Sequence, residues 1–247
     1  MTLERVKLYF LHFGLLEPLA GPDPRSRSMR GYLIQTDEGE NILVDTGLPG
    51  YWGEDINAAL ERDGMANFVR PLEFGPEHTV PGQLALIGLT VDDIDLLLLT
   101  HSDLDHLGGI DFIPESVPIL LSRVERELDV PAPTNPGYYD AWPERDYTLI
   151  EQEDQELRPG IKLLSTPGHT PGHFSLLVDL PRSGPILLAV DAIKMEDEIP
   201  NTGTNVDDAV ASAQRVRDIA AQTGATLIHG HDGPQWTTLR QAPEVYE

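Results

Sequence analysis

Cysteine is absent from the 247 residues of this chain. Disulfide bonds and thiolate ligands are therefore excluded, so any metal ion must be bound by histidine and carboxylate side chains. Basic residues are also scarce, with 17 lysines and arginines against 41 aspartates and glutamates, which gives a formal net charge of -24. Such an anionic surface repels nucleic acids and anionic lipids, so we expect neither as a partner.

Long apolar runs are missing as well. No stretch approaches the length of a membrane span, and the opening MTLERVKLYF lacks the basic and apolar regions of a secretory signal. We therefore expect a cytoplasmic protein. Hydrophobic residues make up 40% of the chain, which is enough to build a large core. Length and composition predict a single domain over residues 1–247 and leave a homodimer open.

Short apolar stretches bounded by turn residues predict a β-rich fold. A hairpin is expected across residues 37–40, between strands at 32–36 and 41–45. Further strands are expected at residues 6–12, 96–100, 118–122, 161–165, 174–179, 185–191 and 226–229. We expect helices at residues 55–62 and 207–223, and a loop at the proline- and serine-rich residues 18–30. This pattern indicates sheets covered by helices in an α/β layered domain.

Histidine and aspartate cluster after four of these apolar strands. The four stretches are LLLLTHSDLDH, STPGHTPGH, LLAVDAIK and TLIHGHDG. Strand ends fix the backbone while the side chains converge in loops, as a preorganised metal site requires. Taken singly, Asp191 has a plainer interpretation as a helix N-cap, and His231 as a hydrogen-bonded surface or core residue. Four such clusters in one cysteine-free chain favour a metal centre.

The motifs THSDLDH, TPGHTPGH, AVDA and HGHD resemble the successive ligand motifs of the metallo-β-lactamase superfamily. NILVDTG resembles that family's early strand, which ends in a supporting aspartate, here Asp45. The resemblance extends from about Val6 to Gln235. It implies an αββα sandwich of two mixed β-sheets flanked by helices, with the site in the cleft between the sheets.

The same resemblance implies two divalent metal ions, which are Zn, Mn or Fe. One would be held by His101, Asp103 and His169, the second by Asp105, His106 and His231, with Asp191 bridging them. His173 and His229 fall outside the ligand positions, so we expect them to support the ligands or the fold.

Within the superfamily, GYLIQTDEGENILVDTG, RPGIKLLSTPGHTPGH and LAVDAIKMEDEIP look like the N-acyl homoserine lactonase branch. This resemblance implies a metallohydrolase of the lactonase or esterase type, which opens a lactone or related ester by attack of metal-bound hydroxide. Asp105 lies near the bridge in this family and is predicted to orient the hydroxide or to shuttle its proton.

The chain departs from the family pattern at Asp103 and Lys194. Asp103 stands where the family usually has histidine, and an oxygen donor shifts metal preference from zinc towards manganese or iron. Lys194 stands where lactonases usually have tyrosine, whose hydroxyl meets the substrate carbonyl. Lysine can donate to that oxygen or can point to solvent. Tyr138 and Tyr139 are further candidates for the missing hydroxyl, and we take Tyr139 as catalytic.

Two alternatives stay open at this point. One is a mononuclear iron enzyme of the same fold that acts on thioester or sulfur substrates. The other is a catalytically lapsed protein that binds a ligand in the old cleft, an idea motivated by Asp103 and Lys194. An apolar wall for an acyl chain is expected from the aromatic and methionine residues of the loops, namely Phe13, Met29, Tyr51 and Trp142.

Overall fold

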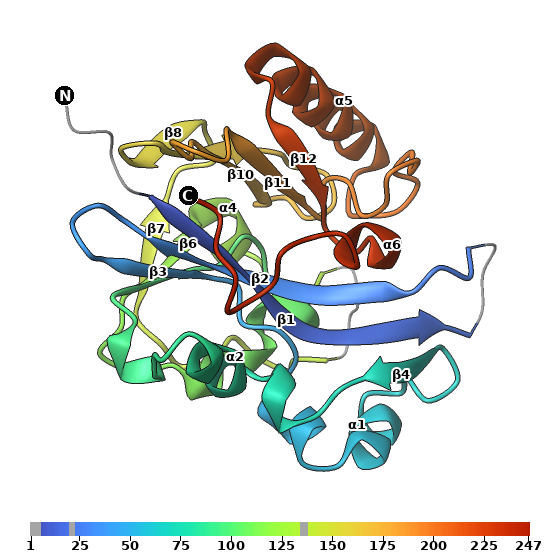
Figure 1. The fold of residues 1–247 in the computed structure, drawn as a ribbon. Helices are drawn as coiled ribbons and strands as arrows, with labels where there is room; N and C mark the ends of the chain where they lie inside the picture. The colour runs from blue at the N-terminus through green and yellow to red at the C-terminus, as the bar shows by residue number, and fades with distance from the viewer. Residues whose placement is uncertain (1–5, 20–22, 134–137) are drawn as a thin grey trace.

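The computed structural model describes residues 6–19, 23–133 and 138–247, which form two β-sheets that face each other (Figure 1). The first sheet has the strand order β4-β1-β2-β3-β5-β6-β7 and the second has the order β12-β11-β10-β9-β8. The first sheet consists of β1 (Lys7–Pro18), β2 (Arg27–Gln35), β3 (Asn41–Val44), β4 (Val69–Glu73), β5 (Leu96–Leu98), β6 (Ile119–Ser122) and β7 (Tyr147–Ile150). The second consists of β8 (Gln155–Arg158), β9 (Ile161–Ser165), β10 (Phe174–Val178), β11 (Ile186–Val190) and β12 (Thr226–His229).

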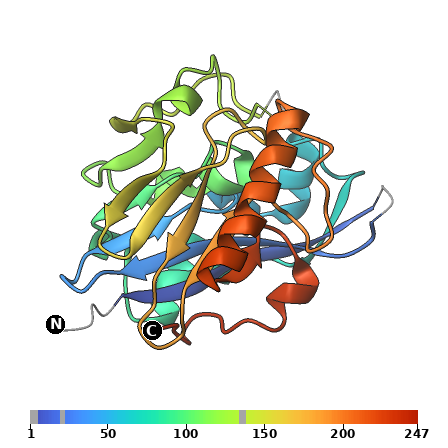
Figure 2. The same ribbon diagram turned by 90° about the horizontal axis from the view of Figure 1, so that it is seen from above.

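Helices cover the outer faces of both sheets. The α-helices are α1 (Ile56–Arg62), α2 (Val80–Leu86), α3 (Leu104–Leu107), α4 (Arg123–Arg126), α5 (Val206–Thr223) and α6 (Gly233–Trp236). Short 3-10 helices are η1 (Gly50–Gly53), η2 (Pro76–His78), η3 (Val91–Asp93) and η4 (Gly108–Phe112). In Figure 1, α1 and α2 lie below the first sheet, and Figure 2 shows α5 crossing the outer face of the second. Among the described residues, no helix is long and apolar enough to span a membrane.

Three apolar layers separate these elements and explain the strand patterns. Phe174, Leu176 and Val178 of β10 pack between the sheets, whereas Leu177, which points to the other face, packs in the layer that contains α5. Successive side chains of β10 thus alternate between two apolar layers, as expected for a strand that is buried on both faces. A third apolar layer lies between the first sheet and the helices α1 and α2. The layers are therefore helix, sheet, sheet and helix, which confirms the predicted αββα sandwich.

Both sheets are mixed, as predicted. In the first, β3, β5, β6 and β7 are parallel neighbours, while β1 pairs antiparallel with β2 and β4. In the second, only the pair of β11 and β12 is parallel among the described strands. Parallel neighbours end at the same edge of a sheet, so the loops that follow them lie close together.

The predicted loop at residues 18–30 is wrong in part. β1 continues to Pro18 and β2 begins at Arg27, because Leu16 pairs with Arg27 across the two strands. Residues 20–22 lie outside the described part of the chain. The polar composition of this segment hid the strand, since cross-strand pairing is not visible in local sequence.

Candidate metal centre

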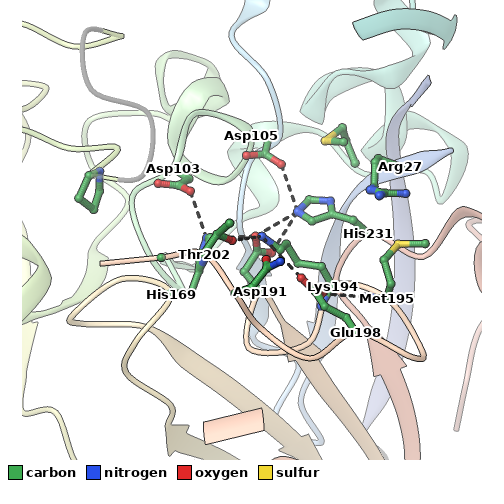
Figure 3. Close-up of a pocket in the computed structure, with 14 residues that line it drawn as sticks. Arg27, Asp103, Asp105, His169, Asp191, Lys194, Met195, Glu198, Thr202 and His231 are labelled. Atoms are coloured by element: carbon green, nitrogen blue, oxygen red, sulfur yellow. Dashed lines mark hydrogen bonds and ion pairs between the residues drawn. The ribbon is translucent and has the colours of Figure 1, made fainter. Parts of the chain in front are cut away.

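The seven side chains predicted as metal ligands lie together where loops follow the strands, and Figure 3 shows five of them around one pocket. They come from four segments: His101, Asp103, Asp105 and His106 after β5, His169 between β9 and β10, Asp191 directly after β11, and His231 after β12. Both sheets contribute, so the cluster closes only when the sandwich forms.

The first group of ligands is His101, Asp103 and His169, all of them buried. Asp103 Oδ2 lies 3.1 Å from His169 Nε2 and 3.9 Å from His101 Nε2. The shorter side chain of aspartate therefore still reaches both histidines. Oxygen and nitrogen atoms at these separations can share one cation.

The second group is Asp105, His106 and His231. Asp105 Oδ2 lies 3.5 Å from His231 Nε2 and 3.7 Å from His106 Nε2. The Asp105 side chain is 21% exposed, whereas those of His106 and His231 are 4% and 9% exposed. This group therefore presents one carboxylate towards the pocket.

Asp191 lies between the two groups. Its Oδ1 atom is 3.3 Å from His106 Nε2 and 3.1 Å from His231 Nε2, and its Oδ2 atom is 3.2 Å from His169 Nε2. One carboxylate thus contacts histidines of both groups, as expected for a bridging ligand.

Hydrogen bonds behind the histidines orient their free nitrogens into the cluster. Asp45 accepts from the Thr100 hydroxyl at 2.8 Å and from His106 Nδ1 at 2.8 Å. Since the Thr100 hydroxyl donates its hydrogen to Asp45, it accepts from His101 Nδ1–H at 3.1 Å. His231 Nδ1 donates to the Ser28 carbonyl at 3.0 Å. Each ring thereby turns its Nε2 atom towards the carboxylates, which is how metal-binding histidines are held.

His101 Nε2 tests whether the donor set fits a metal. This buried atom forms no hydrogen bond with any described residue, and it faces Asp103 Oδ2. Burial lowers the pKa of His101 well below its usual range, with a further contribution from His106, so the ring is neutral and Nε2 carries a lone pair. A lone pair that faces a carboxylate in a buried site is stabilised by a cation between them. The residues therefore fit bound metal ions.

The carboxylates also produce a negative local potential that stabilises positive charge in the cluster. Burial opposes protonation of His169, but Asp191 and Asp103 raise its pKa to about 9. The same negative potential would stabilise divalent ions, and carboxylate and imidazole are suitable ligands for zinc, manganese and iron.

His173, which was predicted to lie outside the ligand set, holds the backbone of Asp191. The Asp191 N–H donates to His173 Nε2 at 3.1 Å, so the opposite Nδ1–H donates to the Thr166 hydroxyl at 2.8 Å. Burial, with a further contribution from His169, lowers the pKa of His173 to about 3, which keeps the ring neutral.

A strained backbone turn also helps to place Asp191. Val190 has a φ of +50°, a conformation that β-branched residues rarely adopt. Gly230 lies so close that an added Cβ would stand 2.3 Å from the Val190 carbonyl oxygen. Only glycine permits this approach, which brings His231 beside Asp191.

Glu125 was missed by the sequence analysis. Its buried carboxylate accepts from Ser102 N–H at 3.0 Å, from the Ser102 hydroxyl at 2.6 Å and from Gly172 N–H at 2.9 Å. Ser102 lies between His101 and Asp103, and Gly172 lies in the loop that carries His169. Glu125 therefore ties together the two loops that supply the first group. No local pattern distinguishes it from the exposed charges around it.

A pocket of about 600 Å³ opens onto the cluster, a size suited to a small ligand. Its lining includes Lys194, whose Nζ lies 4.0 Å from Glu198 Oε1 and 3.4 Å from Thr202 Oγ1 (Figure 3). The side chain of Lys194 is 26% exposed. Lys194 thus lines the pocket while about a quarter of its side chain stays exposed, and Glu198, which the sequence analysis did not single out, lies beside its ammonium group.

The tyrosines predicted as hydroxyl donors lie in different places. Tyr138 lines an adjoining apolar pocket of about 140 Å³, together with Met29 and Asp105. Tyr139 packs against the apolar layer under the first sheet and lines neither pocket, and burial raises its pKa. The geometry therefore favours Tyr138 over Tyr139 for contact with a substrate. Residues 134–137 of the same loop lie outside the described part of the chain.

Of the residues predicted for an apolar wall, Met29 lines both pockets. Phe13, Tyr51 and Trp142 pack in the layer beneath the first sheet instead. Phe13 lies within β1 and Tyr51 within η1, and the side chains of all three residues are used for packing. Arg27 lines both pockets too, although the sequence gave no reason to select it.

Comparison with known proteins agrees with this geometry. The model of the metallo-beta-lactamase superfamily matches residues 31–231, a range that includes all seven side chains of the cluster. The chain belongs to this superfamily.

Similar superfamily members include lactonases. An N-acyl homoserine lactonase from a Bacillus species is 34% identical over 225 residues, which cover 86% of this chain and 84% of that enzyme. N-acyl homoserine lactonase AiiA from Bacillus thuringiensis subsp. kurstaki is 33% identical over 224 residues, with the same coverage. A solved N-acyl homoserine lactone hydrolase, with N-hexanoyl-L-homoserine bound at its catalytic metal centre, superposes with a TM-score of 0.79. It is 29% identical, and the match covers 97% of this chain and 98% of that one.

Proposed function

We propose that this chain is a metal-dependent hydrolase that opens a lactone or a related ester, as N-acyl homoserine lactonases do. The observation that carries the proposal is the convergence of two ligand groups on Asp191 beneath a pocket of about 600 Å³. The similarity to named lactonases over most of the chain supports the same reaction.

His101, Asp103 and His169 would hold one divalent ion and Asp105, His106 and His231 a second, with Asp191 shared between them. When bound, such a pair of ions polarises a carbonyl oxygen and lowers the pKa of water. Asp103 supplies oxygen where imidazole is usual, so we expect manganese or iron to be bound more readily than in a site with histidine there.

Asp105 is the side chain best placed to move a proton. Its carboxylate is part of the second group yet is partly exposed at the pocket. Hydrolysis joins a water oxygen to the acyl carbon, breaks the bond between that carbon and the ring oxygen, and requires one proton to pass from the water to the leaving oxygen. Asp105 would accept this proton and return it.

Lys194 would bind the substrate oxygen. Its ammonium group is held at the pocket by Glu198 and Thr202, and it can donate a hydrogen bond to the carbonyl oxygen as negative charge develops there. Tyr138 lies in the adjoining pocket with Met29, where an apolar acyl group would pack. Tyr139 would support this loop by packing and would not contact the substrate.

The geometry does not favour the two alternatives. A mononuclear iron enzyme needs one complete ligand group, whereas two such groups meet at Asp191 beneath the pocket. A protein that has lost catalysis and only binds a ligand does not require histidines whose Nε2 atoms point to shared carboxylates, as they do in this cluster. Asp103 and Lys194, which motivated that idea, both line the pocket.

The deciding experiment is a substrate panel assayed with purified protein of known metal content. N-acyl homoserine lactones of several chain lengths, simple lactones, aryl esters and thioesters are compared by kcat/KM. We expect lactones to be the best class, with activity abolished in a His231→Ala control. Protein that holds two metal equivalents but hydrolyses no lactone or ester faster than this control would contradict the proposal.

A cytoplasmic location, a homodimer and a single domain over residues 1–247 complete the proposal. Cell fractionation, sedimentation and limited proteolysis test the three in turn. A second protease-resistant fragment would contradict the single domain.

A further inference from the structure

A third group of metal-binding side chains lies outside the pocket. It consists of His12 in β1, Glu73 at the end of β4 and His78 at the end of η2, and we refer to these three residues as the His12 site. One donor atom from each residue lies within 4.8 Å of those from the other two. None of the three lines the pocket above the seven-residue cluster. Figure 1 shows β1 and β4 side by side at this edge of the first sheet.

The two histidines contact each other directly. Their ring centroids are 4.8 Å apart at an interplanar angle of 84°, and each side chain is only 12% exposed. His12 Nδ1 lies 3.8 Å from Glu73 Oε2. His12 Nε2 and His78 Nδ1 are buried and form no hydrogen bond with any described residue, although Glu77 Oε1 lies 3.6 Å from His78 Nδ1. A buried polar atom without a partner is costly, and a metal ion is one way to satisfy it.

Simple ring packing is the plainer explanation for this contact. His12 also packs on Trp236, and His78 stacks on Phe74. Apolar residues would give the same packing without unsatisfied nitrogens, so packing alone does not explain two histidines beside a carboxylate. Two imidazoles and one carboxylate are instead a familiar ligand set for zinc and other transition metals.

Gln83 of α2 holds the two histidine segments in place. Its Oε1 accepts from the His12 backbone N–H at 2.8 Å, and its Nε2 donates to the Glu77 carbonyl, next to His78, at 2.8 Å. Gln83 is itself buried. A bulge in β1 between His12 and Gly14 also interrupts the pairing with β2. Bulges of this kind redirect side chains, and they occur often beside functional sites.

We propose that His12, Glu73 and His78 bind a divalent transition-metal ion such as Zn²⁺, which fastens β1, β4 and η2 together away from the catalytic centre. Tetrahedral ligands at zinc distances are about 3.4 Å apart, so the donors must close slightly on binding. Glu73 is 56% exposed and can rotate to do so. Three protein ligands leave one position for water.

The test is a zinc count on the intact protein. Wild type and the variants Glu73→Gln and His78→Gln are dialysed against buffered Zn²⁺, and bound zinc is measured by elemental analysis. Glu17→Gln serves as the matched control, because Glu17 lies in β1 and already pairs with Arg70 of β4. We expect one zinc equivalent fewer in both site variants than in wild type and in the control. The kcat/KM on the best substrate should stay within about twofold in all four proteins.

Thermal unfolding supplies a second measurement. An ion that binds only the folded state raises Tm, by about 5–10 °C for a chain of this size at a hundredfold excess over Kd. Wild type and Glu17→Gln should show this rise on adding Zn²⁺ to protein whose catalytic centre is already loaded.

Equal zinc content and equal Tm shifts in all four proteins would overturn the His12 site. A loss in His78→Gln alone would overturn the role of Glu73 and, with it, the three-residue site. Because neither readout needs substrate turnover, both outcomes are distinct from a failure of the proposed hydrolase activity.

Discussion

The two ligand groups of the seven-residue cluster differ in burial and in support. In the first group no side chain is more than 7% exposed, and Glu125 binds both of the loops that supply it. The second group includes Asp105, which is 21% exposed and faces the pocket. We infer that the first group gives the cluster its rigidity, whereas the second leaves a carboxylate free to meet substrate. Asp191 is the side chain that joins them.

Removing Asp191 should weaken metal binding by both ligand groups, so the difference between the buried and the partly exposed group should disappear. An Asp191→Ala variant loses the carboxylate that contacts His106, His169 and His231, so we expect it to bind less than one metal equivalent. We expect kcat/KM to fall by about 10³-fold or more, because several kcal/mol of electrostatic stabilisation is lost. Elemental analysis and steady-state kinetics measure both effects. Asp179→Ala, at an exposed position after β10, is the control. Retention of two metal equivalents in Asp191→Ala would show that the groups assemble independently.

Replacing Lys194 should affect the open side of the cluster alone. A Lys194→Met variant keeps the volume but loses the ammonium group, so we expect kcat to fall by about 10²-fold while metal content stays unchanged. Lys162→Met, on the exposed face of β9, should behave as wild type. A decrease below about threefold in both kcat and kcat/KM would assign Lys194 to solvent.

Replacing Glu125 should weaken only the buried group. The amide of a Glu125→Gln variant places a donor against N–H or O–H donors, which costs about 1–3 kcal/mol. We expect one of the two metal sites to lose affinity by about 10- to 100-fold, a usual effect of residues that hold metal ligands. Competition with a chromophoric chelator resolves the two affinities. The neighbouring exposed Glu127→Gln is the matched control. Equal weakening of both sites would mean that Glu125 supports the fold in general.

Changing Asp103 should produce the smallest effect, a change in metal preference. An Asp103→His variant exchanges oxygen for nitrogen and removes one negative charge from the first group, so zinc should be favoured over manganese more than in wild type. The measurement is the ratio of the two metals bound from an equimolar mixture. An unchanged ratio would indicate that Asp103 does not contact the metal, even though it lies 3.1 Å from His169.

The sequence was sufficient to predict the seven-residue cluster, because the residues that resemble the family's ligand motifs follow apolar strands. His101 comes after β5 and Asp191 after β11, and a strand that is buried can be recognised from its own residues. The short edge strand β4 escaped prediction, since VRPLE has neither an apolar run nor regular alternation. Its place depends on pairing with β1, and a proline within it argues against a strand.

The roles of the surrounding residues depend on contacts between distant segments. Glu125 acts on Ser102 and Gly172, which are 23 and 47 residues away, so no window around it carries the signal. The two adjacent tyrosines Tyr138 and Tyr139 have the same chemistry in sequence, yet Tyr138 lines the pocket beside Asp105 and Tyr139 packs against the apolar layer under the first sheet.

Residue type and spacing are local properties, and they predicted an α/β layered domain with histidine and aspartate clustered after apolar strands. The ligand order and the unusual aspartate at position 103 were predicted from the resemblance to the metallo-β-lactamase superfamily. Tertiary structure decided which side chains face the pocket, as with Lys194, and which segments meet, as with His12, Glu73 and His78. The physical reason is that a side chain's role is set by the atoms packed around it. For these residues, those atoms come from elements that are far apart in the chain and adjacent only after the two sheets have formed.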